Sequence, residues 1–164
     1  HQIQWVVSPN PSIHNWCKEH HITCLTTMDE LPANKEGSVD YLFSIVNGKI
    51  LTKTDLSVAR SGSINYHDSL LPKYAGVHAT TWAILNKETE HGITWHMINE
   101  GIDTGDIVYQ KKIAIEQNET VLSLNLRCFE EAIRGFCEII DTLEKSSLTL
   151  QKQQSEERSY YGLH

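Results

Sequence analysis

Apolar and polar positions alternate in short blocks along the first part of the chain. Residues 1–7 alternate as in a strand, and residues 22–26 and 41–46 are short apolar runs of the buried-strand type. Between them, Asn10 and Pro11 form a good N-cap and first-turn pair, so a helix is predicted from there to about residue 20.

The middle of the chain continues this alternation of helices and strands. The pattern predicts a short helix over 52–60, a strand over 62–66, a helix over 78–86, and strands over 92–98 and 106–115. Helices and strands that alternate early, with antiparallel strands late, indicate an α/β fold. Its sheet is expected to be mostly parallel and flanked by helices, with a mixed C-terminal part.

One long amphipathic helix is predicted over residues 119–145. Its apolar positions follow one another in steps of three and four: Leu122, Leu126, Phe129, Ile133, Phe136, Ile140 and Leu143. The sequence after it is polar and rich in glutamine. We therefore expect one domain over 1–145 and an irregular, exposed tail or linker over 146–164.

Composition narrows the class of protein. The 164 residues are 40% hydrophobic, which is typical of a globular domain with its own core. The formal net charge of −7 argues against a nucleic-acid surface, and no apolar run approaches membrane-spanning length. The four cysteines form no CxxC pair, so we expect reduced thiols in a cytoplasmic protein and no metal site.

A polar pair stands at the end of the strand predicted over 62–66. Asn65 and His67 are two residues apart, so their side chains share one face of the strand. In open parallel sheets, ligands bind beyond the carboxyl ends of strands. The pair taken alone could equally cap a turn.

A second polar position follows the strand predicted over 92–98. Asp103 lies in a loop between Gly101 and Gly105, where an Asx-turn would also explain it. A calcium loop would need more oxygen ligands than this segment offers.

Together the two stretches resemble the formyltransferases that use 10-formyltetrahydrofolate. The shared motifs are "NYHDSLLP" at 65–72 and "IDTG" at 102–105, and the resemblance covers about residues 1–145. It implies a Rossmann-like formyltransferase catalytic domain. The family has one more strand and helix before a segment like residues 1–7, so this chain is expected to be a fragment. A sheet edge without that strand would leave self-association as a second outcome.

The resemblance also implies roles for the polar residues. Asn65 and protonated His67 would stabilise the negative oxygen of a tetrahedral intermediate, and Asp103 would orient His67 and favour its charged form. The formyl donor would be 10-formyltetrahydrofolate.

The resemblance further implies a folate pocket with two walls. One wall would be Lys49, Ile50 and Leu51, and the other Asn99, Glu100, Gly101 and Ile102. For Ile50 and Leu51 a place in the core is an equal alternative. Similarly, His96 either faces this pocket or is a hydrogen-bonded histidine of the sheet.

The family formylates several amines. The acidic charge disfavours a nucleic-acid acceptor such as methionyl-tRNA. The expectation that the chain is one domain of a longer protein favours an aminoacyl group on a carrier protein, in an initiation module of a nonribosomal peptide synthetase. A sugar-nucleotide N-formyltransferase is the alternative within the family. A non-catalytic domain that binds folate or a partner is the alternative outside it.

Overall fold

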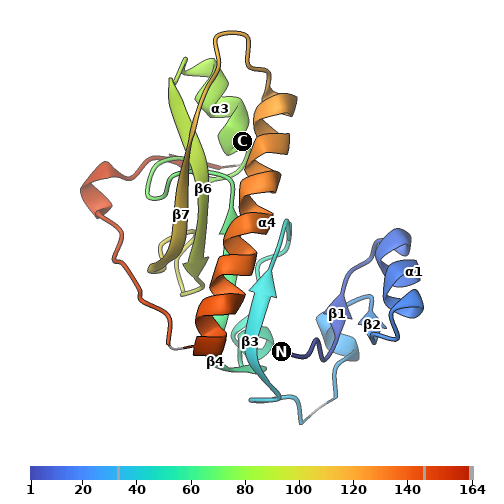
Figure 1. The fold of residues 1–164 in the computed structure, drawn as a ribbon. Coiled ribbons are helices and arrows are strands. Elements are labelled where there is room, and N and C mark those ends of the chain that lie inside the picture. Colours follow the sequence, from blue (N-terminus) through green and yellow to red (C-terminus); the bar gives the residue numbers. More distant parts are fainter. Residues whose placement is uncertain (33, 146, 163–164) are drawn as a thin grey trace. The chain divides into compact units, whose positions relative to one another are not determined.

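The computed structural model describes residues 1–32, 34–145 and 147–162, and Figure 1 traces them along the chain. The chain divides into two compact units, one made of residues 1–42 and 49–62 and the other of residues 43–48 and 63–164. Strands β3 (Val39–Ser44) and β4 (Ala59–His67) begin in the first unit and end in the second.

The first unit contains short elements around a small apolar core. These are β1 (Val6–Val7), α1 (Pro11–Glu19), β2 (Cys24–Leu25), a 3-10 turn (Met28–Glu30) and α2 (Lys53–Leu56). The predicted cap of α1 is present, because the Asn10 side chain accepts a hydrogen bond from the Ser12 N–H. The strand predicted over 1–7 is reduced to β1, which pairs in parallel with β2.

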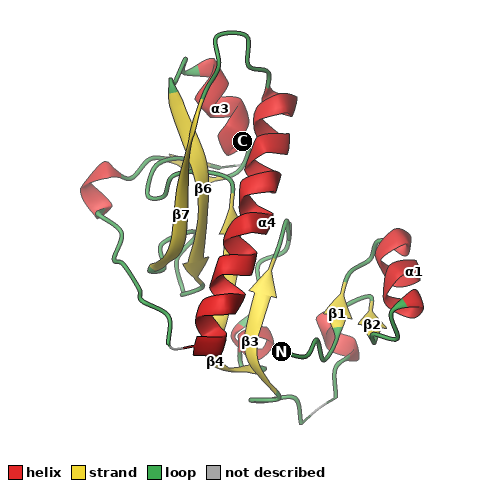
Figure 2. Cartoon of the chain, viewed as in Figure 1, coloured by secondary structure: helices red, strands yellow, loops and turns green. Residues whose placement is uncertain are grey.

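The second unit contains the longer elements (Figure 2). Besides the ends of β3 and β4 they are β5 (Ala75–Gly76), α3 (Ala79–Leu85), β6 (Glu90–Met97), β7 (Ile107–Ala114), α4 (Val121–Lys145), a 3-10 turn (Ser155–Glu157) and β8 (Tyr160–Tyr161). Every helix and strand predicted between residues 39 and 145 is present, with shifts of a few residues at its ends.

The main sheet has the strand order β3-β4-β6-β7. The mixed α/β class is thereby confirmed, but β4–β6 and β6–β7 both pair antiparallel, against the expected mostly parallel sheet. For β6–β7 the reason is local. The short loop of residues 98–106 connects β6 to β7, and only antiparallel strands can be joined so closely. Parallel pairing occurs between the short strands β1–β2 and β5–β8.

Helix α4 lies along β6 and β7 (Figure 1), and its buried face coincides only in part with the apolar stripe that the spacing predicts. Its buried residues are Leu124, Cys128, Ala132, Gly135 and Ile139. From the predicted apolar stripe, Phe129 and Phe136 pack against aromatic residues of the sheet. By contrast, Leu122 is 70% exposed and Ile133 is 66% exposed. Small side chains decide this, because they let the helix backbone approach the aromatic residues of the sheet more closely than leucines would.

The C-terminal segment is more structured than predicted. Gln151 pairs with Ile107 through backbone hydrogen bonds, and β8 pairs with β5. The expectation of an irregular tail is therefore wrong for residues 151–161, and the domain boundaries proposed from the sequence stay a prediction. Residues 146, 163 and 164 of that tail lie outside the described residues.

A search of the helices within these described residues finds none with the length and apolar character needed to cross a bilayer.

We predict that Gly135→Ala destabilises the protein, although alanine is the better helix former. A methyl group at this position would lie 2.6 Å from Cε1 of Tyr109 and 3.3 Å from Cδ1 of Trp95. Overpacking of this kind costs about 1–3 kcal/mol, whereas helix propensity returns only about 1 kcal/mol. Urea denaturation should therefore give a lower free energy of unfolding for the variant.

The exposed Glu130 of the same helix offers the control. There Glu130→Ala should be more stable than Glu130→Gly by about 1 kcal/mol, from propensity alone. If Gly135→Ala were stabilising by a similar amount, close packing of α4 on the sheet would be wrong.

Candidate active site

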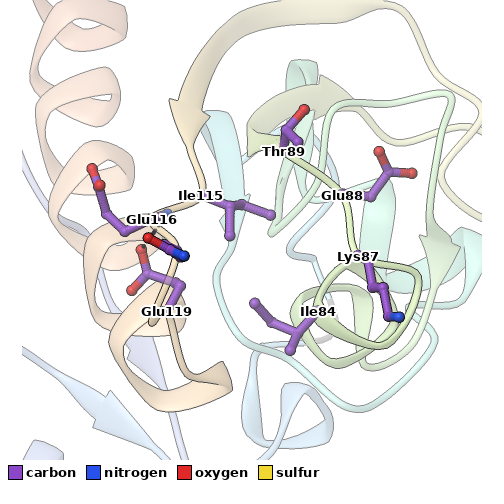
Figure 3. A pocket seen from close by; sticks show the side chains of 8 residues that line it. Ile84, Lys87, Glu88, Thr89, Ile115, Glu116 and Glu119 are labelled. Atoms are coloured by element: carbon purple, nitrogen blue, oxygen red, sulfur yellow. Dashed lines mark hydrogen bonds between the residues drawn. The ribbon is translucent and has the colours of Figure 1, made fainter.

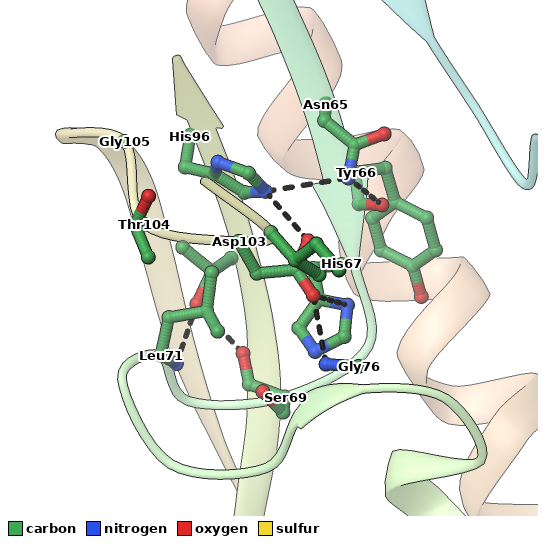
Figure 4. Close-up of polar contacts among 12 residues, drawn as sticks. Asn65, Tyr66, His67, Ser69, Leu71, Gly76, His96, Asp103, Thr104 and Gly105 are labelled. Atoms are coloured by element: carbon green, nitrogen blue, oxygen red, sulfur yellow. Dashed lines mark hydrogen bonds and ion pairs between the residues drawn. The ribbon is translucent and has the colours of Figure 1, made fainter. Parts of the chain in front are cut away.

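Strand β4 carries Asn65 and His67 at its carboxyl end. In the β4–β6 register, Asn65 stands opposite His96 and His67 stands opposite Thr94. Two-residue spacing places Asn65 and His67 on one face, so His96 joins them from the neighbouring strand (Figure 4).

The His67 ring is held at both nitrogens. Nε2 lies 2.8 Å from the carbonyl oxygen of Tyr74, so Nε2 carries a proton and donates a hydrogen bond to that oxygen. Nδ1 faces the Asp103 carboxylate, 3.8 Å from Oδ2. The His67 residue is 6% exposed, and its orientation is therefore fixed by protein groups rather than by water.

Asp103 lies in the loop between β6 and β7, with a left-handed backbone at φ 52°. Its carboxylate accepts a hydrogen bond from the Gly76 N–H, 2.8 Å from Oδ2. Oδ1 lies 3.5 Å from Nε2 of His96. Only glycine fits at position 105 of this loop, because a Cβ atom there would lie 1.7 Å from the carbonyl oxygen of Met97.

His96 sits between Asn65 and Asp103. Its Nδ1 lies 2.9 Å from the carbonyl oxygen of Met97, which fixes a proton on Nδ1. Its Nε2 lies 3.3 Å from the Asn65 amide nitrogen, which also donates to the Tyr66 carbonyl oxygen at 3.0 Å. A neutral His96 accepts from Asn65, whereas a charged His96 donates to Asp103 instead.

These contacts control the charge of Asp103. Burial would by itself raise the pKa of this carboxyl group, whose side chain is 13% exposed. The hydrogen bond with His96, the charge of His67 and the Gly76 N–H act in the opposite direction, and together they lower the pKa below its ordinary value of 3.8. Asp103 is therefore ionised at neutral pH.

The loop after β4 is anchored by the buried hydroxyl of Thr94. This hydroxyl donates to the Ser69 carbonyl oxygen at 2.6 Å and accepts from the Leu71 N–H at 3.1 Å. Gln110 donates both to Thr94 Oγ1 and to the Leu71 carbonyl oxygen, at 2.9 Å each. The chain direction after His67 is thus fixed by strands β6 and β7.

The residues expected to bind folate belong to both units. Lys49, Ile50 and Leu51 lie in the first, where Ile50 is 85% exposed and Leu51 packs against the core, as its alternative assignment requires. Residues 99–102 lie in the second, where the Asn99 side chain caps its own loop. Their assignment to a folate pocket stays a prediction.

A separate hollow of about 280 Å³ lies between the end of α3 and the start of α4 (Figure 3). Its lining residues are Ile84, Lys87, Glu88, Thr89, Ile115, Glu116, Gln117 and Glu119. Glu88 accepts a hydrogen bond from the Tyr74 hydroxyl, and Glu119 pairs with Arg127. Because none of the predicted site residues lines it, this hollow is not the candidate site.

The sequence left the role of His96 open and gave no sign of the residues that approach Asp103 from the C-terminal segment. For His96 the signal was present, since the strand that carries it leads directly to Asp103. For the C-terminal residues no local pattern pointed to the site, because their contacts span about 50 residues of sequence.

Comparison with known proteins identifies the family of the chain. A family model described as formyl transferase matches residues 27–140, which is more than half of the chain. The methionyl-tRNA formyltransferase of Caldanaerobacter subterraneus subsp. tengcongensis is 36% identical over 126 residues, covering 77% of this chain and 41% of that protein. The chain thus spans about two fifths of the length of this curated relative.

Solved structures give a similar result. A sugar 3N-formyl transferase crystallised with dTDP and 5-N-formyl-THF is 27% identical, with a TM-score of 0.76 over 92% of this chain and 53% of that one. An N-formyltransferase of Helicobacter canadensis, in complex with folinic acid and dTDP-3-aminofucose, is 29% identical. Its TM-score is 0.74 over 90% of this chain and 53% of that one. By its motifs, its fold and these matches, the chain belongs to the formyl transferase family.

Proposed function

We propose that this chain transfers a formyl group from 10-formyltetrahydrofolate to a primary amine. The observation that carries the proposal is the ionised Asp103 carboxylate, which faces His67 on one side and His96 on the other. Asn65 completes the group through its contact with His96.

Formyl transfer places two demands on such a site. The neutral amine attacks the formyl carbon, and negative charge develops on the formyl oxygen in the tetrahedral intermediate. The bond from that carbon to N10 then breaks, N10 gains a proton, and the amine loses one. The site must therefore stabilise an oxyanion and move a proton, and it needs no nucleophilic side chain.

Asn65 suits the first demand. One of its N–H groups donates to the Tyr66 carbonyl oxygen at 3.0 Å, while the longer contact of 3.3 Å to His96 is the weaker of the two. The N–H that faces His96 is therefore the one that can be given to an oxyanion. When Asn65 no longer donates to His96, Nε2 of His96 can carry a proton and donate a hydrogen bond to the Asp103 carboxylate.

His67 and Asp103 suit the second demand. Nδ1 of His67 points to Asp103 across 3.8 Å, a gap wider than a direct hydrogen bond. A proton that Nδ1 accepts from the amine, directly or through a water molecule, would be stabilised by the carboxylate. The charged ring would in turn help to neutralise the oxyanion.

For the acceptor we propose an aminoacyl group on a carrier protein, as in an initiation module of a nonribosomal peptide synthetase. The acidic net charge of −7 supports an acceptor other than a nucleic acid. A nucleotide-linked amino sugar is the second candidate, because a solved relative at 29% identity contains dTDP-3-aminofucose. Methionyl-tRNA enters the test because a curated relative is named for it.

We expect His67→Ala to lower kcat roughly 100- to 1000-fold, the usual loss when one oxyanion donor is removed. Binding of the folate donor should stay nearly unchanged, because the role proposed for the imidazole is in proton transfer and not in holding the donor. The measurement is tetrahydrofolate release with a panel of amines.

The exposed His20 provides the control, and His20→Ala should turn over at the wild-type rate. Full activity of His67→Ala would refute the role given to this ring. A wild-type chain that binds folate but formylates no amine would support the non-catalytic alternative.

The acceptor can be identified by competition. With 10-formyltetrahydrofolate in excess, we expect kcat/KM for an aminoacyl carrier protein to exceed that for a dTDP-amino sugar and for methionyl-tRNA by at least about tenfold, or 1.4 kcal/mol. Mass spectrometry of the three products measures the order. If the amino sugar or the tRNA were preferred by the same margin, that acceptor would replace the carrier protein.

The charge of Asp103 predicts how stability depends on pH. Its pKa is lowered from 3.8 on folding, so its contribution is complete above the unfolded value and is lost as pH falls through the folded value. Between pH 6 and about 3, the wild-type free energy of unfolding should therefore fall more steeply than that of Asp103→Asn. Equal slopes in urea denaturation would mean that folding leaves the carboxyl pKa unchanged.

A further inference from the structure

The C-terminal segment of residues 151–161 contacts both loops of the candidate site. It lies outside residues 27–140, which match the family model, and its polar sequence predicts a linker. In the structure, however, it belongs to the same compact unit as Asn65, His67 and Asp103. Its contacts are directed at the backbone around the latter two residues.

Gln153 holds the Asp103 loop from behind. Its amide nitrogen donates to the carbonyl oxygen of Asp103 at 3.0 Å and to that of Gly105 at 2.7 Å. Arg158 donates to the neighbouring carbonyl oxygen of Ile102 at 2.9 Å. A left-handed backbone at a residue other than glycine persists only when its surroundings fix it. These three bonds provide that constraint at φ 52° of Asp103.

The two carbonyl partners also fix which way the Gln153 amide points. Its nitrogen faces two acceptors, whereas its oxygen is buried and has no hydrogen-bond partner within the described part of the chain. The reverse orientation would place three oxygens together. Gln153 is therefore bound as a donor, and an oxygen in place of its NH₂ group would repel the loop.

Ser159 holds the His67 side. Its hydroxyl accepts a hydrogen bond from the Tyr74 N–H at 2.8 Å, and its carbonyl oxygen accepts from the Ala75 N–H at 3.0 Å. The Tyr74 carbonyl oxygen is the acceptor for His67 Nε2. The peptide that orients His67 is thus itself oriented by Ser159. Tyr74, like Asp103, has a left-handed backbone, at φ 57°.

Gly76 joins the two sides. Its N–H donates to the Asp103 carboxylate, and a side chain at this position would lie 2.1 Å from the carbonyl oxygen of Tyr161. The C-terminal segment therefore passes so close to the Gly76 backbone that only glycine fits.

We propose that residues 151–161 act as a strap that positions Asp103 and His67 for the reaction, with Gln153 and Ser159 as its two positioning residues. Neither residue touches a substrate in this role. The strap fixes the direction of the carboxylate through the loop backbone and the direction of the imidazole through the Tyr74 peptide. The effect on catalysis rests on the proposed formyl transfer, whereas the effect on His67 geometry does not.

The first test compares Gln153→Glu with the matched variant Gln154→Glu at the exposed neighbouring position. Both add one negative charge to the same segment. We expect Gln153→Glu to lower kcat about 10- to 100-fold with KM for donor and amine changed less than threefold, since a misplacement of about 1 Å costs on the order of 100-fold. Gln154→Glu should match the wild type. Equal kcat for the two variants, or a lower melting temperature without a change in kcat, would overturn the proposal.

The second test needs no turnover. Solvent exchange of the His67 Nε2–H is measured by NMR with ¹⁵N-labelled histidine in the wild-type chain and in Ser159→Ala. We expect at least about tenfold faster exchange in the variant, because the Tyr74 N–H loses its acceptor and the left-handed backbone of Tyr74 keeps only the bond from the Ala75 N–H to the Ser159 carbonyl oxygen. An unchanged amide spectrum for α4 would confirm the fold. Unchanged exchange would refute the strap. A wild-type chain that shows protected His67 but no formyl transfer would refute the proposed function alone.

Discussion

The ion pair and hydrogen bonds around the Asp103 carboxylate are the interaction on which the rest of the site depends. A buried carboxylate without partners would become protonated, because burial disfavours its charged form. Here a backbone N–H and two imidazole rings face its two oxygens, and its pKa is lowered instead of raised. The fixed negative charge faces Nδ1 of His67. It also gives His96 two alternative partners.

The fold satisfies this constraint with strained loops on a rigid sheet. Asn65, His67 and His96 come from the paired strands β4 and β6. Asp103 comes from a loop with a left-handed backbone, and Gly76 from the short strand β5, which packs closely against Tyr161. Such loops keep one conformation only where several bonds determine it. Thr94 fixes the loop after β4, and the strap of residues 151–161 fixes the loops around Tyr74 and Asp103. The loops that orient His67 and Asp103 are therefore held in one conformation, as the proposed chemistry requires.

Local sequence patterns were sufficient to predict the helices and strands, but not the tertiary contacts that these elements make. Strand period, the Asn10 cap and two short motifs predicted the strands, the helices, the family, and the positions of Asn65, His67 and Asp103. For α4 they predicted the helix but only part of its buried face, because spacing alone cannot tell a face of small residues such as Gly135 from a stripe of larger ones. They also failed for Gln153, since a bond to a carbonyl oxygen 50 residues away leaves no local trace.

The most direct measurement is the titration of the Asp103 carboxyl carbon, followed by ¹³C NMR in the folded chain with Asp103→Asn to assign the signal. If two histidines and a backbone N–H hold the charge as described, the midpoint lies below 3.8. A midpoint at or above 3.8 would show that burial prevails over these partners. Asp103 could not then be the fixed charge that orients His67, and the proposed chemistry would lose its basis.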